Sequence, residues 1–483
     1  MSRVLGQAAV VIGLCVISAG MVGAQSNPEA ARVESASFVV DLLAAQIVGD
    51  GGQYQEIGVA ATLEVAPVSF VGGMSFRNDG KYGEVQSGFW LGFGAEFEEG
   101  GVLVDLSPFN LRAGRFPHAD LVDSPYSLFV SSVELSAVLL EFSVTTPRLF
   151  YSSRWLELKR VSALGYPDRG ANLRSYGISF EPFRFGFQDV VVYSGRTFDL
   201  EYLVNPLPGF FLQYITGSGG VPWREAINDN SIMGFFLDYS RPELYAYGQI
   251  LIDDLNTNAV LAPDSFQNPS KVAWSLGGRY ALQSGTIGLY HAGATKYTFQ
   301  AYGAGSPGSA TDTKYGYVYY PDVTYPAGGT DQTIVPEENY IGYLHGENNI
   351  ALLADYQTLI GPVAVKSTME LTVSGSKSPA NPWHELNSFS EGGQGTRFLD
   401  DERLETRLVT RGRGEWVLGP WTVFADLELG YVWNELELTP VPPALSGGDP
   451  DNSIPYFAPG TTNRFLGTLR IGGSYTFPLV ANQ

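Results

Sequence analysis

The sequence predicts an all-β protein, a transmembrane antiparallel β-barrel of about 16–18 strands with long extracellular loops. Three observations predict this fold: an export signal at the N-terminus, a recurring two-residue alternation of apolar and polar side chains, and strand lengths of about ten residues. The body of the chain contains no long apolar run of the kind that forms a membrane-spanning helix.

The N-terminus predicts export. It reads MSRVLGQAAVVIGLCVISAGMVGAQ, with basic Arg3, an apolar centre over residues 10–17, and small Val22 and Ala24 before the expected cleavage site. We expect residues 1–24 to be a cleaved signal peptide and residues 25–483 to form the barrel in the outer membrane. An uncleaved anchor is the alternative, but the apolar centre is shorter than a spanning helix requires.

Composition restricts the chemistry and the partners. Cys15 is the only cysteine and lies in the predicted signal peptide, which excludes disulfides, thiolate metal sites and a cysteine nucleophile from the mature chain. The formal charge of −21 makes nucleic acid an unexpected partner, because phosphate binding needs a basic surface. An acidic chain instead favours attraction of cations.

The segment YAYGQILIDDL, residues 245–255, shows the alternation most clearly. One side carries Ala246, Gly248, Ile250 and Ile252, and the other carries Tyr245, Tyr247, Gln249, Leu251 and Asp253. A strand with two such faces separates two solvents. We expect lipid on the apolar face and a water-filled lumen on the polar face.

The same pattern recurs in SGFWLGFGAEF, VAWSLGGRYAL, VKSTMELTVSG, TVFADLELGYVW and TLRIGGSYTF. Charged residues occupy the polar faces in mid-strand, among them Arg279, Lys366, Glu370, Asp426 and Arg470. A soluble sandwich also alternates, but many of these strands end in aromatic residues and no amphipathic helix is expected between them to cover an apolar face. Strands in hydrocarbon cannot leave backbone groups unpaired, so the sheet must close.

Turns and loops follow from Pro, Gly and polar clusters. PLPG (residues 206–209) and LIGPVAV (residues 359–365) are expected to be tight turns. Three longer irregular stretches, residues 301–339, 376–403 and 439–463, are expected on the outer surface or folded within the pore.

The stretch from residue 189 to residue 255 resembles the outer-membrane barrels of the capsule assembly protein Wzi family. The matching elements are Tyr193, Gly195 and Arg196; Glu201, Tyr202, Asn205 and Pro206; Asn228, Asp229 and Asn230; Tyr247, Gln249, Asp253 and Asp254; and later His345, Gly346, Glu347 and Asn348. The resemblance implies an 18-stranded barrel that binds or anchors capsular or other extracellular polysaccharide at the cell surface and performs no chemistry. The chain departs from the family in reaching the strand-like ASFVVDLLAAQIV soon after the predicted cleavage site, and in following a last strand ending at Phe477 with PLVANQ.

A polysaccharide site needs aromatic faces beside groups that satisfy hydroxyls. The candidate residues are Tyr193, Arg196, Tyr202, Asn205, Asn230, Tyr247, Gln249 and Asp253. Alternatively, the tyrosines belong to an interfacial belt and the Asp and Asn side chains cap turns. Arg196 with Asp253 or Asp254 is also a candidate lumen ion pair that fixes strand register.

Other functions remain open at this stage. A porin-like passive channel for small polar or cationic solutes fits the barrel size and the charge. An enzyme is not expected, and neither catalytic residues, a metal site nor a cofactor is predicted, because His118, His291, His345 and His384 lie far apart in the sequence. GGDPDNS, with Asp449 and Asp451, lacks a full calcium-loop pattern. A structural surface protein is a further alternative, and the expected partners are outer-membrane lipid, extracellular polysaccharide and the machinery that assembles outer-membrane barrels.

Overall fold

The computed structural model describes residues 35–48, 53–78, 93–132, 135–159, 168–217, 229–255, 257, 261, 269–299, 341–377, 396–439 and 456–480. The predicted signal peptide, the stretch 301–339 and the GGDPDNS segment lie outside these residues. Within the described ranges, no helix is both long enough and apolar enough to cross a membrane.

The fold is an 18-stranded antiparallel sheet with a separate two-stranded hairpin. The sheet contains β1 (Ser35–Val48), β2 (Gln53–Val65), β3 (Val68–Arg77), β4 (Gly94–Leu106), β5 (Phe109–Pro117), β6 (Ser136–Thr145), β7 (Leu149–Lys159), β8 (Arg169–Phe180), β9 (Phe183–Ser194), β10 (Asn230–Ser240), β11 (Leu244–Asp254), β12 (Lys271–Leu282), β13 (Gly285–Ala294), β14 (Asn349–Ile360), β15 (Val363–Ser374), β16 (Glu405–Leu418), β17 (Trp421–Trp433) and β20 (Arg464–Val480). The hairpin is β18 (Leu436–Thr439) with β19 (Tyr456–Pro459).

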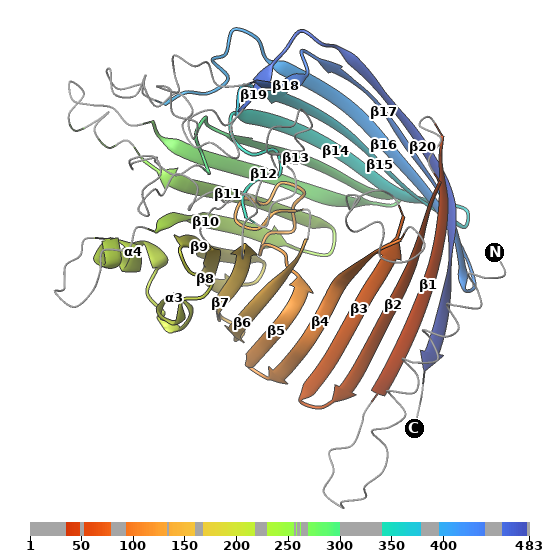
Figure 1. The fold of residues 1–483 in the computed structure, drawn as a ribbon, viewed down its shortest axis with the longest axis horizontal. Coiled ribbons are helices and arrows are strands. Elements are labelled where there is room, and N and C mark those ends of the chain that lie inside the picture. The colour runs from red at the N-terminus through yellow and green to blue at the C-terminus, as the bar shows by residue number, and fades with distance from the viewer. Residues whose placement is uncertain are drawn as a thin grey trace, which may run out of the picture.

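The sheet closes on itself, which confirms the predicted barrel. Consecutive strands of the sheet pair with one another, including β17 with β20 across the β18–β19 hairpin, and β1 pairs with β20 from Ser37↔Val480 to Val48↔Leu469. Figure 1 shows the first and last strands side by side at this seam. The last strand runs to Val480, three residues beyond its predicted end at Phe477.

The two ends of the barrel differ in their connections. Short turns follow β2, β4, β6, β8, β10, β12, β14 and β16, whereas the connections at the other end are mostly long. In outer-membrane barrels the short turns face the periplasm and the long loops face outward. The prediction for LIGPVAV is confirmed, because Gly361 and Pro362 join β14 to β15.

The strand faces separate as the alternation predicted. On β11, Ile250 is 41% exposed on the outer surface, whereas Tyr247, Gln249 and Leu251 are 6%, 4% and 0% exposed. On β17, Leu427 and Leu429 are outward and exposed, and Asp426 faces inward to bond with Arg470 of β20. The outer surface is therefore apolar, as contact with lipid requires.

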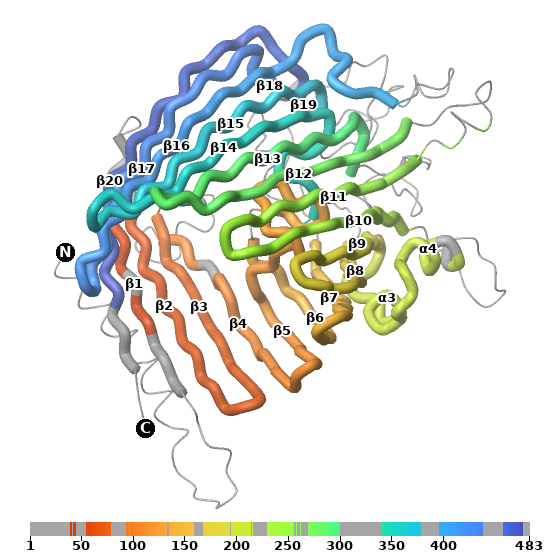
Figure 2. The backbone as a smooth tube through the Cα atoms, turned by 180° about the vertical axis from the view of Figure 1, so that it is seen from behind, coloured from red at the N-terminus to blue at the C-terminus, as the bar shows by residue number. Residues whose placement is uncertain are grey.

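Two predictions about the connection between β9 and β10 are wrong. It contains two helices, α3 (Leu200–Val204) and α4 (Gly209–Gly217), where no helix was expected. Pro206 and Gly209, expected in a tight turn, lie between or at the start of these helices. Asp199 caps α3 by accepting hydrogen bonds from the backbone N–H groups of Glu201 and Tyr202. Both views place the helices outside the ring of strands, beside β7 to β10 (Figure 1 and Figure 2).

Candidate functional site: the barrel lumen

The connection between β5 and β6 folds into the barrel, and we call residues 118–132 the inward loop. Its side chains at Tyr126, Leu128, Phe129 and Val130 are 0% exposed. The orange segment within the ring of strands in Figure 1 includes this loop. Burial of these four side chains removes apolar surface from water, and this stabilises the loop inside the lumen.

Asp120 anchors the inward loop to the wall. Its carboxylate accepts hydrogen bonds from the backbone N–H groups of Phe129 (3.0 Å) and Val130 (3.1 Å). It also accepts from the side-chain amides of Gln188 on β9 (2.9 Å) and Gln249 on β11 (3.2 Å). One charged acceptor thus ties the loop to two strands.

The polar face of β11 therefore meets a protein segment. Gln249 accepts a hydrogen bond from the backbone N–H of Leu128 at 2.9 Å. Tyr245 accepts one from the N–H of Asp123 at 2.9 Å, and the hydroxyl of Tyr247 pairs with that of Ser124. The expectation that this face looks into the lumen is confirmed, and the side chains of this face contact the inward loop there.

The inward loop also contacts β15, four strands along the sheet from β11. The Tyr126 hydroxyl donates to Glu370 of β15 at 2.7 Å, and His345 Nε2 lies 2.8 Å from the same carboxylate. The ring of Tyr126 packs edge-on against Tyr343 with centroids 5.8 Å apart. Burial and the neighbouring Glu370 raise the pKa of Tyr126, so its hydroxyl stays protonated and donates.

His118 begins the inward loop and is 2% exposed. Burial first, then the charges of Arg154 and Arg112, lower the pKa of His118 to about 3. Its Nδ1 lies 3.4 Å from Arg154, which forms an ion pair with Glu141 at 2.9 Å. The imidazole is therefore neutral at neutral pH, and its Nδ1 accepts a hydrogen bond from Arg154.

A second part of the lumen wall, formed by β15, β16, β17 and β20, carries charged side chains of both signs. Arg411 on β16 contacts Glu428 on β17 at 2.7 Å and Glu370 on β15 at 3.3 Å. One level nearer the short turns, Asp426 lies between Arg413 at 3.3 Å and Arg470 at 2.5 Å. We call these residues, with Lys366 and Arg407, the charged wall.

Three cavities lie along the charged wall and share lining residues. The cavity near the outer loops has a volume of about 650 Å³ and is lined by Glu370, Lys377, Arg407 and Arg411, with Phe457 of the β18–β19 hairpin. Arg411 also lines the middle cavity of about 520 Å³.

The third cavity, of about 660 Å³, shares Lys366 and Arg413 with the middle one and reaches Ser284 in a short turn. The cavities therefore follow the wall from the outer loops towards the periplasmic turns.

Two cations on this wall have no ion pair with any residue that the structure describes. Arg407 lines the outer cavity, and Lys366 lines the two lower ones. Lys366 stands directly across from Arg413 in the pairing of β15 with β16. Because Arg413 is itself paired with Asp426, Lys366 is the cation at this level whose charge favours an anion from solution.

The predicted site residues form two groups, not one. Tyr193, Arg196, Tyr202 and Asn205 gather around α3 on the outer side of the wall. Arg196 pairs with Asp229 at 2.9 Å and Asp199 at 2.8 Å, and lies over the Tyr193 ring at 4.6 Å. The alternative ion pair of Arg196 with Asp253 or Asp254 is wrong.

The remaining members of this outer group have structural contacts. Tyr193 and Tyr202 stack with centroids 5.7 Å apart, and Tyr202 donates to Asp229 at 2.9 Å. Asn205 ends α3 and accepts from the N–H of Leu207 at 3.1 Å. Asn230 begins β10.

The second group, Tyr247, Gln249 and Asp253, faces inward from β11. Tyr247 and Gln249 hold the inward loop, and Asp253 pairs with Lys271 at 3.3 Å and accepts from the N–H of Phe299 at 3.0 Å. Sequence reasoning did not single out Asp120 or the pair Arg411 and Arg413. The alternating TRGRGE of β16 was the available signal for the two arginines.

A closed antiparallel barrel with an apolar outer surface and charged inner side chains defines an outer-membrane β-barrel. Comparison of the sequence with protein-family models finds no match, and comparison with curated proteins finds none.

Several solved structures are similar. Wzi of Escherichia coli, described as an outer membrane protein involved in group 1 capsule assembly and a carbohydrate-binding β-barrel, aligns with a TM-score of 0.51 at 10% identity, over 92% of this chain and 85% of that chain. OprD of Pseudomonas aeruginosa aligns with a TM-score of 0.44 at 10% identity, over 93% and 96% of the two chains. OccAB4 of Acinetobacter baumannii aligns with a TM-score of 0.44 at 10% identity, over 94% and 100%. At 10% identity the similarity to Wzi shows the barrel fold alone.

Proposed function

We propose that this outer-membrane barrel conducts small polar solutes through the part of its lumen that the charged wall lines. The observation that carries the proposal is the run of three cavities sharing Arg411, then Lys366 and Arg413, from the outer loops to the short turns. Such a run offers a solute charged contacts at successive levels of the barrel.

The exposure of the charged wall supports an aqueous path. The side chains of Arg411, Arg413 and Arg470 are 43%, 40% and 33% exposed although their strands lie within the membrane span. Charged groups at that depth remain ionised and exposed only where water reaches them. The inward loop contacts this wall through the hydrogen bond from Tyr126 to Glu370 and occupies the part of the lumen beside it.

The sign of the wall bears on the preferred solute. The chain's charge of −21 led us to expect cations. On the charged wall, however, Glu370, Glu428 and Asp426 are paired with arginines, whereas Lys366 and Arg407 have no ion-pair partner among the described residues. We therefore propose that the preferred solutes carry an anionic group such as a carboxylate.

Conductance in planar bilayers tests this function. Folded protein should give steady currents, and Lys366→Glu should shift the reversal potential in a KCl gradient towards cation selectivity. Arg148→Glu is a matched control, because this substitution makes the same charge change at an exposed residue away from the wall, in the short turn between β6 and β7. Absence of current from correctly folded protein, or equal shifts from both variants, would count against the proposal.

Polysaccharide binding is the second candidate, favoured by the polar outer cavity. Carboxylates, Arg407 and the Phe457 ring there are the groups that bind sugar hydroxyls and sugar faces. The similarity to Wzi of Escherichia coli supports this candidate only through the shared fold. On this proposal Tyr247 and Gln249, selected from the sequence, act indirectly by holding the inward loop in the lumen.

Polymer retention on cells distinguishes the two candidates. Arg407→Ala with Phe457→Ala should release polysaccharide if the outer cavity binds it, and Arg148→Ala is the control. If cells with the unmodified protein retain polymer, cells with the double variant lose it, and the barrel carries no current, the binding role is favoured over the channel.

A further inference from the structure

The outer surface of the barrel is interrupted by polar residues over β7 to β10. On β9 the outward positions Phe183, Phe185 and Phe187 are apolar, but the next outward residue is Asp189. Asp189 pairs with Arg174, the outward residue at the same level of β8, at 3.6 Å, and both side chains are 0% exposed. An ion pair facing hydrocarbon without cover would be strongly unfavourable.

The helices α3 and α4 provide that cover. We call residues 196–217 the helical shelf. Its backbone accepts hydrogen bonds from outward side chains: Ser153 donates to the carbonyl of Leu203 at 2.7 Å, and Tyr176 donates to that of Pro206 at 2.9 Å. The N–H of Gly209, at the start of α4, donates to Asp189 at 3.0 Å.

More contacts fix the shelf against the same wall. Trp155 donates to the carbonyl of Thr197 at 2.6 Å, and Ser231 of β10 pairs with Gln213 of α4 at 2.5 Å. The shelf therefore lies on the outer side of the wall, opposite to the side that the inward loop occupies.

The face of the shelf turned away from the barrel is apolar. Its exposed residues are Phe198, Leu200, Val204, Leu207, Phe210, Phe211 and Ile215, at 40–59% exposure. A segment exposing this many large apolar residues to water would be an unusual surface for a soluble loop.

The depth of the shelf follows from comparison with β17. Six to ten residues from its short turn, β9 has Asp189, Val191 and Tyr193, all covered. Six to ten residues from its own short turn, β17 has Leu427, Leu429 and Tyr431, all exposed on the outer surface. At roughly 2.5 Å of height per residue for a strand tilted by about 40°, these positions lie about 15–25 Å from the turns, inside an apolar band about 25 Å tall.

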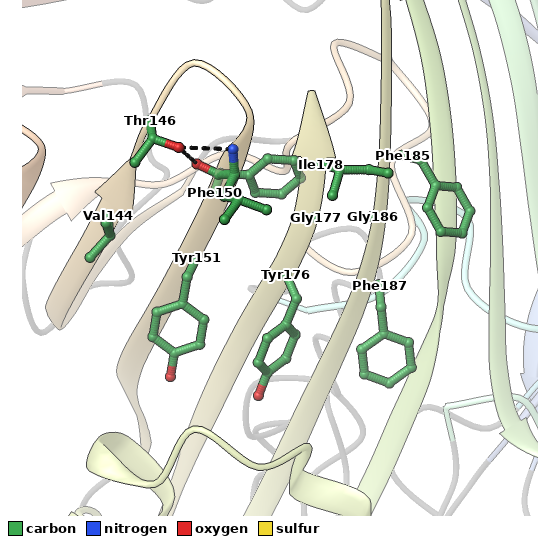
Figure 3. Close-up of a pocket in the computed structure, with 11 residues that line it drawn as sticks. Val144, Thr146, Phe150, Tyr151, Tyr176, Gly177, Ile178, Phe185, Gly186 and Phe187 are labelled. Atoms are coloured by element: carbon green, nitrogen blue, oxygen red, sulfur yellow. Dashed lines mark hydrogen bonds between the residues drawn. The ribbon is translucent and has the colours of Figure 1, made fainter. Parts of the chain in front are cut away.

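We propose that the helical shelf lies within the outer leaflet of the membrane and that its apolar face contacts lipid acyl chains in place of strand surface. The shelf is continuous with the lipid-facing surface below it. There the rings of Tyr151, Tyr176 and Phe187 stand side by side on neighbouring strands (Figure 3), with centroids 5.2 and 6.0 Å apart. They line a groove of about 680 Å³ beneath the shelf, and the Tyr176 hydroxyl bonds to the shelf itself.

The proposal is tested by spin labels whose contact with oxygen, which enters lipid, is compared with contact with a water-soluble nickel complex. Labels are placed at Phe211→Cys and, separately, Val204→Cys, in a chain with Cys15→Ser so that each introduced cysteine is the only one. The protein is reconstituted in phosphatidylcholine vesicles. Leu429→Cys on β17 is the lipid reference, and Gln283→Cys in the turn between β12 and β13 is the water reference.

The shelf labels should resemble Leu429→Cys, with an oxygen-to-nickel ratio several-fold above that of Gln283→Cys. A ratio like that of Gln283→Cys places the shelf in water and overturns the proposal. Low contact with both reagents means that protein, such as a second copy, covers this face, and it also overturns the proposal. Heat-dependent gel mobility confirms folding of each variant, and the second label position serves if one variant fails to fold.

Discussion

Replacement of Asp120 by alanine should release the inward loop from the wall. The variant removes the shared acceptor of the N–H groups of Phe129 and Val130 and of the amides of Gln188 and Gln249. A hydrogen bond to a charged group contributes about 1.5–3 kcal/mol, and a conservative 1 kcal/mol for each of four donors gives about 4 kcal/mol. That loss lowers the ratio of docked to undocked loop by roughly a thousandfold.

Chymotrypsin reports the docked state directly. It cleaves after large apolar and aromatic residues, and Tyr126, Leu128 and Phe129 are 0% exposed when the loop is docked. Asp120→Ala should be cut within this loop under conditions that leave the unmodified protein intact. In planar bilayers the same variant should give larger and noisier currents, because the inward loop no longer fills its sector of the lumen.

The matched control is Asp123→Ala in the same loop. The Asp123 side chain is 64% exposed and pairs with Arg279, itself 41% exposed, at 2.5 Å. Exposed pairs contribute about 0–1 kcal/mol, so this variant should behave nearly like the unmodified protein. If Asp120→Ala resists chymotrypsin and conducts like Asp123→Ala, the anchoring role of Asp120 is refuted.

Three further predictions concern the loops. The lowered pKa of His118 gives a contribution to stability that is present above the unfolded-state pKa of about 6.5 and is lost as the pH falls towards about 3. The urea midpoint should therefore fall more between pH 7 and pH 4 in the unmodified protein than in His118→Gln. Parallel falls in the two proteins would contradict this. Arg196→Ala leaves the buried Asp229 without its cation, which costs about 3–5 kcal/mol and should expose the helical shelf to protease, whereas Arg196→Lys should be milder; equal resistance of both would argue against the pairing. Tyr126→Phe removes the donor to Glu370 and should lower stability by about 1–3 kcal/mol in urea unfolding, and an unchanged midpoint would show that this contact is not stabilising.

The strands and their facing were predictable because the signal is local. A period of two marks which side chains of β11 and β17 face lipid, and it needs no knowledge of distant residues. The inward loop gives no such signal. Asp120 finds its partners 68 residues away at Gln188 and 129 residues away at Gln249, and nothing in the sequence around Asp120 specifies either contact.

The candidate site was predictable only in part. Gln249 and Tyr247 do face inward, as the alternation indicated. The prediction that they form one site with Arg196 is wrong, because Arg196 lies on the outer side of the wall and they lie on the inner side. The sequence signal for the outer group is Asp189, a charged residue at an outward position that follows the outward phenylalanines of β9. A break of this kind predicts that another segment covers the strand there, and short α3 and α4 were not recognised because their composition is largely apolar rather than amphipathic.

The pairing of β1 with β20 also has a consequence for biogenesis. The first and last strands of the sheet pair with each other. The sheet therefore stays open, with two edge strands whose backbone groups are unpaired, until the chain is present as far as residue 480. Such edge strands readily join foreign strands. Removal of β20 should therefore give a species that aggregates through these edge strands instead of a slightly smaller closed barrel.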